Sequence, residues 1–401
     1  MTPPAEKMEN APLATAEDSV SPTAKILIVS TTVPPLTTGS AVIVANLMAK
    51  LEPGTAVAVG EGREPMRFVH GHAVHFFRSE PGWATRGRRF IRWTRWARFR
   101  SLVRFIDRIS KENGRGPIVA VFPDEMQVAA ARTVAKRHGL PFFPYFHNTY
   151  TDNRRGLARL FGKRIERRII EAGDRVLVLT SALGDLLKSR YPEATYDIVP
   201  HSFAFAGNHA DVVRAPDGTI RIGILGNINE SNMDAFLRLF RALDDSMFVT
   251  LYSGSTPSWF FEKLGVLGPR VRHEQPSDEH LLGKLRENDI LYLPHGLNGR
   301  WGSAEYRTIF PTRTAPYMGS GRPVLAHIPQ QSFLYDWLHQ RDCAEIVTTP
   351  SENDLRAAIH RLTTDRRRSQ QLVQNAAAAF REFDPERVSR SFKGIVTGGK
   401  S

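Results

Sequence analysis

Residues 25–51 read KILIVSTTVPPLTTGSAVIVANLMAKL, and the order of elements in this stretch predicts the fold. The run KILIVST has the unbroken apolar character of a strand that is buried on both faces of a parallel sheet. After a loop that contains a glycine, AVIVANLMAKL has the length and spacing of a helix. A buried strand followed by a helix is the repeating unit of a doubly wound α/β fold.

The same unit recurs along the chain. Apolar strand patterns return in PIVAVF, PFFPYFH and DRVLVLT, with helical patterns between them, and the alternation restarts at Ile220 with IRIGILG. We therefore expect two doubly wound Rossmann-like domains that face a central cleft, where ligands bind at the carboxyl ends of the strands. The expected division is a disordered leader at 1–24, an N-terminal domain at 25–205 and a C-terminal domain at 206–380.

Composition narrows the class of protein. The chain has 401 residues, a hydrophobic fraction of 41% and no apolar run near the roughly 20 residues that span a bilayer. It has a single cysteine, Cys343, and no signal-peptide pattern, so we expect a cytoplasmic protein. The formal net charge of +13 favours an anionic partner, such as nucleic acid, acidic lipid or a phosphorylated substrate.

A second informative stretch is FPTRTAPYMGSGRPVL at residues 310–325. It predicts a loop, a short helix that begins at Thr312 or Thr314, and a buried strand from Pro323. The start of a helix offers unpaired backbone N–H groups to an anion, and Arg313 adds a positive charge there. We therefore expect a phosphate group at Thr312, Arg313 and Thr314.

Several segments together carry a family resemblance. The chain resembles the GT-B glycosyltransferases, specifically the retaining group-1 (family 4-like) enzymes. The resemblance is carried by residues 25–51, by ERRIIEAGDRVLVLTSALGDLLKSRYP followed by YDIVPHSF, and by RPVLAH after YMGSG. The resemblance covers the chain from Lys25 to about Val396.

The resemblance implies a function. It implies the transfer of a hexose from a nucleotide-sugar to a glycan, lipid-linked or polysaccharide acceptor, with retention, without a metal and with no cofactor besides the donor. The donor would bind the second domain, and the leaving phosphate would itself deprotonate the acceptor. Residues 381–401 would form a last helix that crosses back to the first domain.

The sequence departs from the family at the donor site. Relatives carry two glutamates ahead of the late glycine–proline turn, and these positions fall on Thr308 and Pro316 here. A departing diphosphate still needs positive charge, which Arg313 and Arg307 can supply. Glu305 lies three residues before Thr308 and is the candidate to compensate for a missing carboxylate.

Three residues of the first domain are candidates for the acceptor side. Gly39 and Ser40 lie where a loop opens a helix, and the resemblance places a donor or acceptor loop there. The alternative for Ser40 is an ordinary helix cap. His147 follows the strand PFFPYF at its carboxyl end, and the resemblance implies that it is the histidine near the sugar. We interpret His147 as the catalytic residue.

Residues 83–109, WATRGRRFIRWTRWARFRSLVRFIDRI, concentrate positive charge and aromatic side chains. From Trp96 onward the spacing is helical, and Trp96, Phe99, Val103 and Ile106 share the face predicted to be buried. Cations beside interfacial aromatics favour an anionic membrane surface or acceptor, so the protein is expected to be peripheral at the inner face of the membrane. Nucleic acid, which we do not expect, and a plain solvated helix are the competing interpretations. The candidate residues are Arg92, Trp93, Arg95, Trp96 and Arg98.

Two other functions remain open at this stage. A sugar-nucleotide epimerase or hydrolase would share the fold, but no convincing acid and base pair stands out. A non-catalytic GT-B scaffold with a degenerate donor site would explain the lost glutamates. We expect no metal site, because His70, His72 and His75 have a spacing that does not point them at one ion.

Overall fold

The structure is a computed structural model of the 401-residue chain. It describes residues 24–36, 39–78, 91–122, 125–204, 218–228, 232–253, 270–297 and 303–398. The predicted leader and the boundary predicted at residues 205 and 206 lie outside the described residues, except for Ala24.

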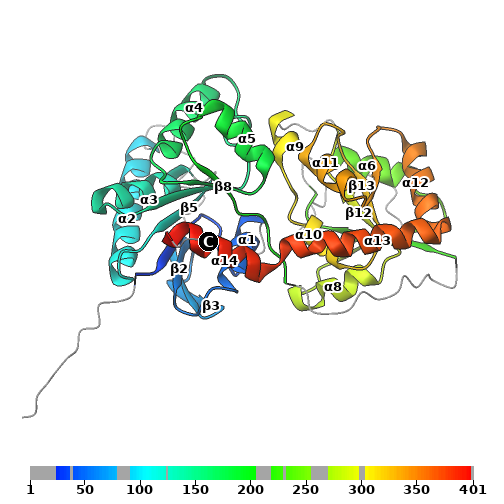
Figure 1. The fold of residues 1–401 in the computed structure, drawn as a ribbon, viewed down its shortest axis with the longest axis horizontal. Coiled ribbons are helices and arrows are strands. Elements are labelled where there is room, and N and C mark those ends of the chain that lie inside the picture. The colour runs from blue at the N-terminus through cyan, green and yellow to red at the C-terminus, as the bar shows by residue number, and fades with distance from the viewer. Residues whose placement is uncertain are drawn as a thin grey trace, which may run out of the picture.

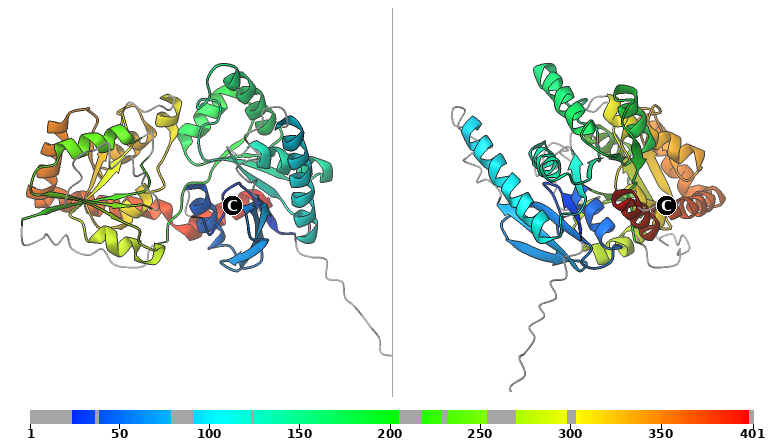
Figure 2. Two further views of the ribbon diagram at one scale, coloured as in Figure 1. Left: turned by 180° about the vertical axis from the view of Figure 1, so that it is seen from behind. Right: turned by 60° about the vertical axis from the view of Figure 1, so that its left-hand side comes forward.

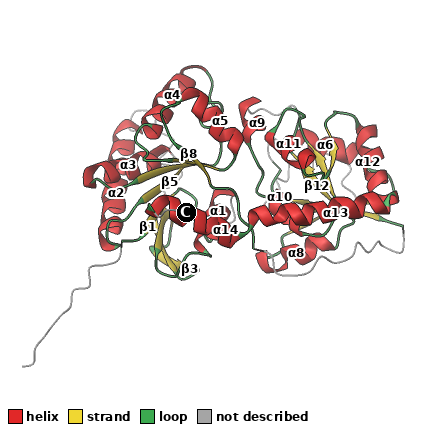
Figure 3. Cartoon of the chain, viewed as in Figure 1, coloured by secondary structure: helices red, strands yellow, loops and turns green. Residues whose placement is uncertain are grey.

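The N-terminal domain is built on an eight-stranded sheet with the order β3-β4-β2-β1-β5-β6-β7-β8 (Figures 1 and 3). Every neighbouring pair is parallel except β3 and β4, which run antiparallel at one edge. The strands with unbroken apolar sequences, such as β1 and β5, are buried along their whole length, as both faces are covered. Their bounds are β1 Ile26–Val29, β2 Ala56–Gly62, β3 Met66–Val69, β4 His72–Arg78, β5 Ile118–Phe122, β6 Phe142–Phe146, β7 Val176–Val178 and β8 Tyr196–Ile198.

Helices cover both faces of this sheet. One core cluster joins the sheet to Ile106 of α2, Val134 of α3, Ile169 of α4 and Leu187 of α5. On the opposite face the sheet packs against α1 through residues such as Leu47. The bounds are α1 Gly39–Met48, α2 Ile91–Glu112, α3 Glu125–His138, α4 Gly156–Ile170 and α5 Ser181–Arg190.

The C-terminal domain has a six-stranded, fully parallel sheet with the order β11-β10-β9-β12-β13-β14. Side chains of α6 and α12 pack on one face, those of α10 and α11 on the other, and α13 contributes to both clusters. The strands are β9 Ile220–Leu225, β10 Met247–Tyr252, β11 Val271–Glu274, β12 Ile290–Pro294, β13 Val324–His327 and β14 Glu345–Val347. The helices are α6 Met233–Ala242, α8 Asp278–Arg286, α9 Ser303–Thr308, α10 Thr314–Gly319, α11 Phe333–Gln340, α12 Glu352–Thr364 and α13 Arg366–Phe380, followed by the short 3-10 helix η1 Arg381–Phe383.

The last helix, α14 (Pro385–Thr397), returns to the N-terminal domain. Its residues Val388, Phe392 and Val396 enter the same core cluster as α1, and the Ser389 hydroxyl donates a hydrogen bond of 3.0 Å to the Leu47 carbonyl. Figure 2 shows this helix, in red, beside the blue elements at the start of the chain. The chain therefore crosses between the domains twice.

The predicted fold class, two doubly wound α/β domains, is confirmed. Within the described ranges, no helix combines the length and hydropathy that a bilayer-spanning segment needs.

Candidate functional site

His147 and Ser40, which are 107 residues apart in the sequence, lie in contact. His147 follows β6, Ser40 lies in the first turn of α1, and the His147 Nδ1 atom is 2.9 Å from the Ser40 hydroxyl oxygen. A Cβ atom placed on the neighbouring Gly39 would meet nothing within 4 Å. The structure thus brings the predicted loop and the predicted histidine together, with open space beside them.

The His147 ring is buried and electrically neutral. Burial lowers its pKa to about 3, and the nearby His201 contributes in the same direction. Its Nε2 atom is buried and has no hydrogen-bond partner in the described part of the chain. A neutral imidazole with an unused ring nitrogen can donate one hydrogen bond to a hydroxyl group or accept one from it.

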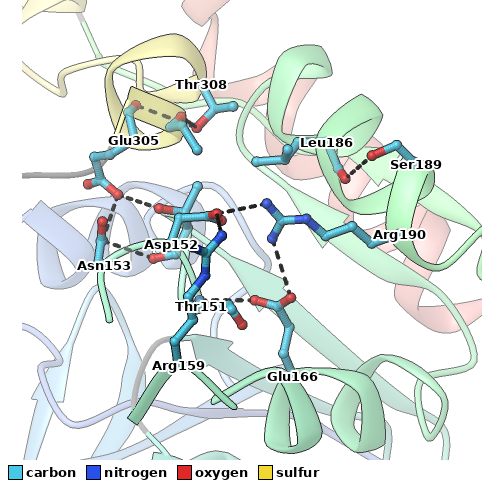
Figure 4. Close-up of polar contacts among 12 residues, drawn as sticks. Thr151, Asp152, Asn153, Arg159, Glu166, Leu186, Ser189, Arg190, Glu305 and Thr308 are labelled. Carbon is cyan, nitrogen blue, oxygen red and sulfur yellow. Dashed lines mark hydrogen bonds and ion pairs between the residues drawn. The ribbon is translucent and has the colours of Figure 1, made fainter. Parts of the chain in front are cut away.

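Glu305 of the C-terminal domain reaches into the loop after β6 (Figure 4). Its Oε2 atom accepts hydrogen bonds from the Thr149 hydroxyl at 2.6 Å and from the Asn153 side-chain amide at 2.7 Å. Burial raises the pKa of Glu305, while these two hydrogen bonds oppose the rise. The candidate carboxylate therefore connects the two domains, and it does so in the loop that carries His147.

Two more hydrogen bonds between the domains lie beside this one. Thr180, at the start of α5, donates to the Thr308 carbonyl at 2.8 Å, and His201 Nε2 donates to the Phe310 carbonyl at 2.7 Å. Thr308 is the first of the two positions at which the family resemblance implied a glutamate. In this chain the position is buried and makes a backbone contact with the other domain.

Arg313 lies at the carboxyl edge of the C-terminal sheet. Its guanidinium packs on Gly226, the residue after β9, where a Cβ atom would come within 3.1 Å of Arg313 Cζ and Nη2. Burial lowers the pKa of Arg313, and Nη1 is buried without a hydrogen-bond partner among the described residues. An unsatisfied buried guanidinium is costly, so such a group is expected to meet an anion in the working protein.

His295 was not predicted from the sequence. It directly follows β12, its Nε2 atom is buried without a partner in the described residues, and the charge of Arg313 contributes to the lowering of its pKa, which burial brings to about 4. Its ring meets the edge of Tyr306, the residue after Glu305. The signal that could have found it is the one used for His147, a histidine at the carboxyl end of a buried strand.

The helix predicted near Thr312 is present as α10, but its amide cradle is smaller than predicted. The Thr314 amide donates to the Pro311 carbonyl, Pro316 has no N–H group, and the Thr314 side chain is fully buried. Thr312 is half-buried. In this segment, two buried side-chain atoms have no hydrogen-bond partner among the described residues: Arg313 Nη1 and the Thr314 hydroxyl oxygen. Of these, Arg313 is the one with a positive charge for an anion, and Arg307 is exposed.

The arginine and tryptophan segment differs from the prediction. Helix α2 begins at Ile91, and Trp96 is 52% exposed instead of packing in the core, with the Arg100 guanidinium 4.6 Å from its ring centroid. Arg98 turns toward its own domain, where it pairs with Glu61 at 2.9 Å. Arg95 is exposed, and the side chains of Arg92 and Trp93 lie outside the described part.

In the described ranges, no group of three or more histidine, cysteine, aspartate or glutamate side chains is arranged to hold a metal ion.

No protein-family model and no curated protein matches the chain. Solved structures do. Sucrose-phosphate synthase from Thermosynechococcus elongatus superposes with a TM-score of 0.70 at 14% identity, over 92% of this chain and 98% of that one. HepE from Anabaena in complex with UDP gives 0.65 at 13% identity, over 93% and 100%. The UDP-forming alpha,alpha-trehalose-phosphate synthase from Burkholderia vietnamiensis gives 0.65 at 12%, over 93% and 100%.

These similarities establish the fold. The chain has the GT-B fold, and at the level of fold the resemblance seen in the sequence is confirmed.

Proposed function

We propose that the protein is a glycosyltransferase that takes its sugar from a nucleotide-sugar bound to the C-terminal domain. The observation that carries this proposal is the buried Nη1 of Arg313, which has no hydrogen-bond partner among the described residues and lies with His295 at the carboxyl edge of the sheet. A nucleoside diphosphate supplies negatively charged oxygens that can accept hydrogen bonds from this guanidinium. Ligands of doubly wound sheets bind at this edge.

Arg313 also suits the chemistry of the proposed step. The bond between the sugar anomeric carbon and the diphosphate oxygen breaks, a bond from the acceptor oxygen to that carbon forms, and the acceptor proton passes to the leaving phosphate. Negative charge grows on the diphosphate, and a fixed cation in a shielded site stabilises it. We extend the proposal to a metal-independent hexosyl transfer with retention, as the family resemblance implies.

The acceptor is proposed to bind the N-terminal domain beside Gly39, Ser40 and His147. Neutral His147 holds an acceptor or sugar hydroxyl through Nε2, which has no partner among the described residues, while Ser40 fixes the orientation of the ring. The proposed acceptor is a glycan or a lipid-linked sugar.

We propose uridine as the base of the donor. The HepE structures are described as complexes with UDP, with UDP-glucose, and with UDP and glucose, and one of the trehalose-phosphate synthases is described as UDP-forming. These descriptions concern proteins that share 12–13% of their residues with this chain, so the base needs its own test.

A thermal-shift titration against UDP, GDP, ADP and TDP tests the donor site, with Arg313→Ala as the variant and the exposed Arg307→Ala as its control. A nucleotide at one hundred times its Kd adds about 2.7 kcal/mol of stability. We expect UDP to raise the melting temperature of the wild type and the Arg307 variant, and to lose this effect in Arg313→Ala. No shift with any nucleotide would overturn the proposal.

One observation favours a second function, a GT-B scaffold that binds the nucleotide without turning it over. Thr308 and Pro316 occupy the two usual glutamate positions, and both are buried. UDP-glucose consumption with and without added acceptors separates the two functions. Saturable UDP binding with no release of UDP from the sugar nucleotide in any condition would favour the scaffold.

A further inference from the structure

The first turns of helix α4 expose three large apolar side chains. Leu157, Leu160 and Phe161 are 73%, 63% and 67% exposed. At 100° per residue they share one side of the helix, opposite the buried residues Gly162 and Glu166. Single exposed apolar residues are ordinary, but a contiguous group on one helix marks an interaction surface.

Positive charge surrounds this apolar tip. Arg164 and Arg168 continue the same outward side of α4, one and two turns further along. Arg155, Lys163, Arg164 and Arg168 are exposed and form no ion pair within the described residues. A groove of about 530 Å³ runs between α4 and the end of α5, where Arg159, Lys163, Arg164 and Arg167 face Arg190 and Tyr191.

Hydrogen bonds and ion pairs on the buried side of α4 fix the position of this helix (Figure 4). The buried carboxylate of Glu166 accepts hydrogen bonds from the Thr151 amide at 3.1 Å and the Tyr191 hydroxyl at 3.0 Å, and it lies 3.6 Å from Arg190 Nη1. Arg190 also donates to Asp152 at 2.8 Å. These contacts hold α4 against α5, so the exposed side chains are presented without further ordering of the helix.

We propose that this side of α4 docks on an anionic lipid bilayer, with Leu157, Leu160 and Phe161 entering the acyl boundary and the cations contacting phosphate headgroups. Aliphatic side chains at a tip with a cationic surround match the two layers of a membrane surface. Nucleic acid matches them less well, because base stacking needs aromatic platforms, and the tip has two leucines for one phenylalanine.

The location fits a peripheral enzyme. Figure 1 places α4 at the outer edge of the N-terminal domain. Helices α2 and α4 both begin at the carboxyl edge of their sheet, since each follows a parallel strand, so exposed Trp96 near the start of α2 lies toward the same edge. The docking surface stands independently of the proposed activity. A lipid-linked acceptor, which rests on that activity, would arrive near His147, in the loop that leads into α4.

The test is flotation of the full chain with vesicles of phosphatidylglycerol and phosphatidylcholine in equal parts, against phosphatidylcholine alone. The apolar contribution is measured with Phe161→Ser. Phe68→Ser is its matched control, because Phe68 is also 67% exposed but lies on β3. We expect Phe161→Ser to lower the partition coefficient by about tenfold or more, from the loss of one buried aromatic side chain, and Phe68→Ser to leave it unchanged.

The charge contribution is measured with the double variant Lys163→Glu, Arg164→Glu. The control is Arg366→Glu, Arg367→Glu, which makes the same change of net charge at two exposed positions of α13. Each cation near the surface contributes about fivefold to partition, so reversing two of them costs at least about 25-fold. Circular dichroism and a thermal melt confirm that each variant is folded.

Three results would overturn the proposal: no binding to the anionic vesicles, equal losses in the α4 variants and their controls, or α4-dependent binding of RNA in place of vesicles. Because the assay contains no nucleotide, its failure is distinct from a failure of the donor site.

Discussion

The contact between Glu305 and the loop after β6 leads to a quantitative prediction. The Thr149 hydroxyl and the Asn153 amide both donate to one carboxylate oxygen, at 2.6 and 2.7 Å. A hydrogen bond to a charged group contributes about 1.5–3 kcal/mol, and the desolvation that raises the pKa of Glu305 offsets part of this. We expect Glu305→Ala to lower the free energy of unfolding by about 2–3 kcal/mol.

A double-mutant cycle tests the cause of that loss. Glu305→Ala, Thr149→Ala and the double variant are unfolded in urea at pH 7, and we expect an interaction energy of about 1–2 kcal/mol between the two sites. Glu345→Ala is the control, because Glu345 accepts two hydrogen bonds from Arg361 within one domain, at an exposed pair worth about 1 kcal/mol or less. If the two single changes add within about 0.3 kcal/mol, the bond does not join the domains and the reasoning fails.

Three further predictions concern other parts of the structure. The pKa of His147 is lowered from 6.5 to about 3, so the unfolded chain takes up a proton that the folded chain excludes, and stability falls as the pH drops below 6.5. His147→Gln should therefore lose about 2 kcal/mol less than the wild type between pH 7 and 5, measured by urea unfolding. Gly226→Ala, at a φ of +99° and 3.1 Å from the Arg313 guanidinium, should cost about 1–3 kcal/mol in urea unfolding and weaken UDP binding in the thermal-shift assay. Phe392→Ala should cost about 3–5 kcal/mol in urea, because α14 completes the N-terminal core; a smaller loss than 1 kcal/mol would mean that α14 is not part of that core.

The sequence predicted the fold well because parallel strands covered on both faces have unbroken apolar sequences, as in β1 and β5. It also singled out Ser40 and His147 as separate candidates, each at the carboxyl edge of the same sheet, and the structure places the two in contact. The contacts between the two domains could not be predicted from the sequence. Thr149 and Glu305 are 156 residues apart, and no local pattern specifies which loops of two separate sheets will meet.

The predicted burial of Trp96 in helix α2 was wrong for a physical reason. Helical spacing shows which residues share one side of a helix. It does not show how far along the helix the sheet extends and buries that side. Trp96 has the spacing of a core residue and is half exposed, because α2 is buried through Val103 and Ile106 further along. Leu157 and Phe161 have the same spacing in α4 and remain in solvent. The prediction of a basic, aromatic surface was centred on residues 83–109, whereas among the described residues a contiguous exposed apolar group lies on α4.

The loop after β6 contacts the proposed acceptor site, the C-terminal domain and the base of α4. Its first residue, His147, contacts Ser40 on the acceptor side, and further along the loop Thr149 bonds Glu305 of the donor domain. Next to these, the Thr151 amide bonds Glu166 beneath the exposed side of α4. A short backbone segment with fixed contacts in three directions cannot move at one of them without straining the others. A change at one of these contacts is therefore expected to affect the other two, and the thermodynamics of linkage makes that coupling the same in both directions.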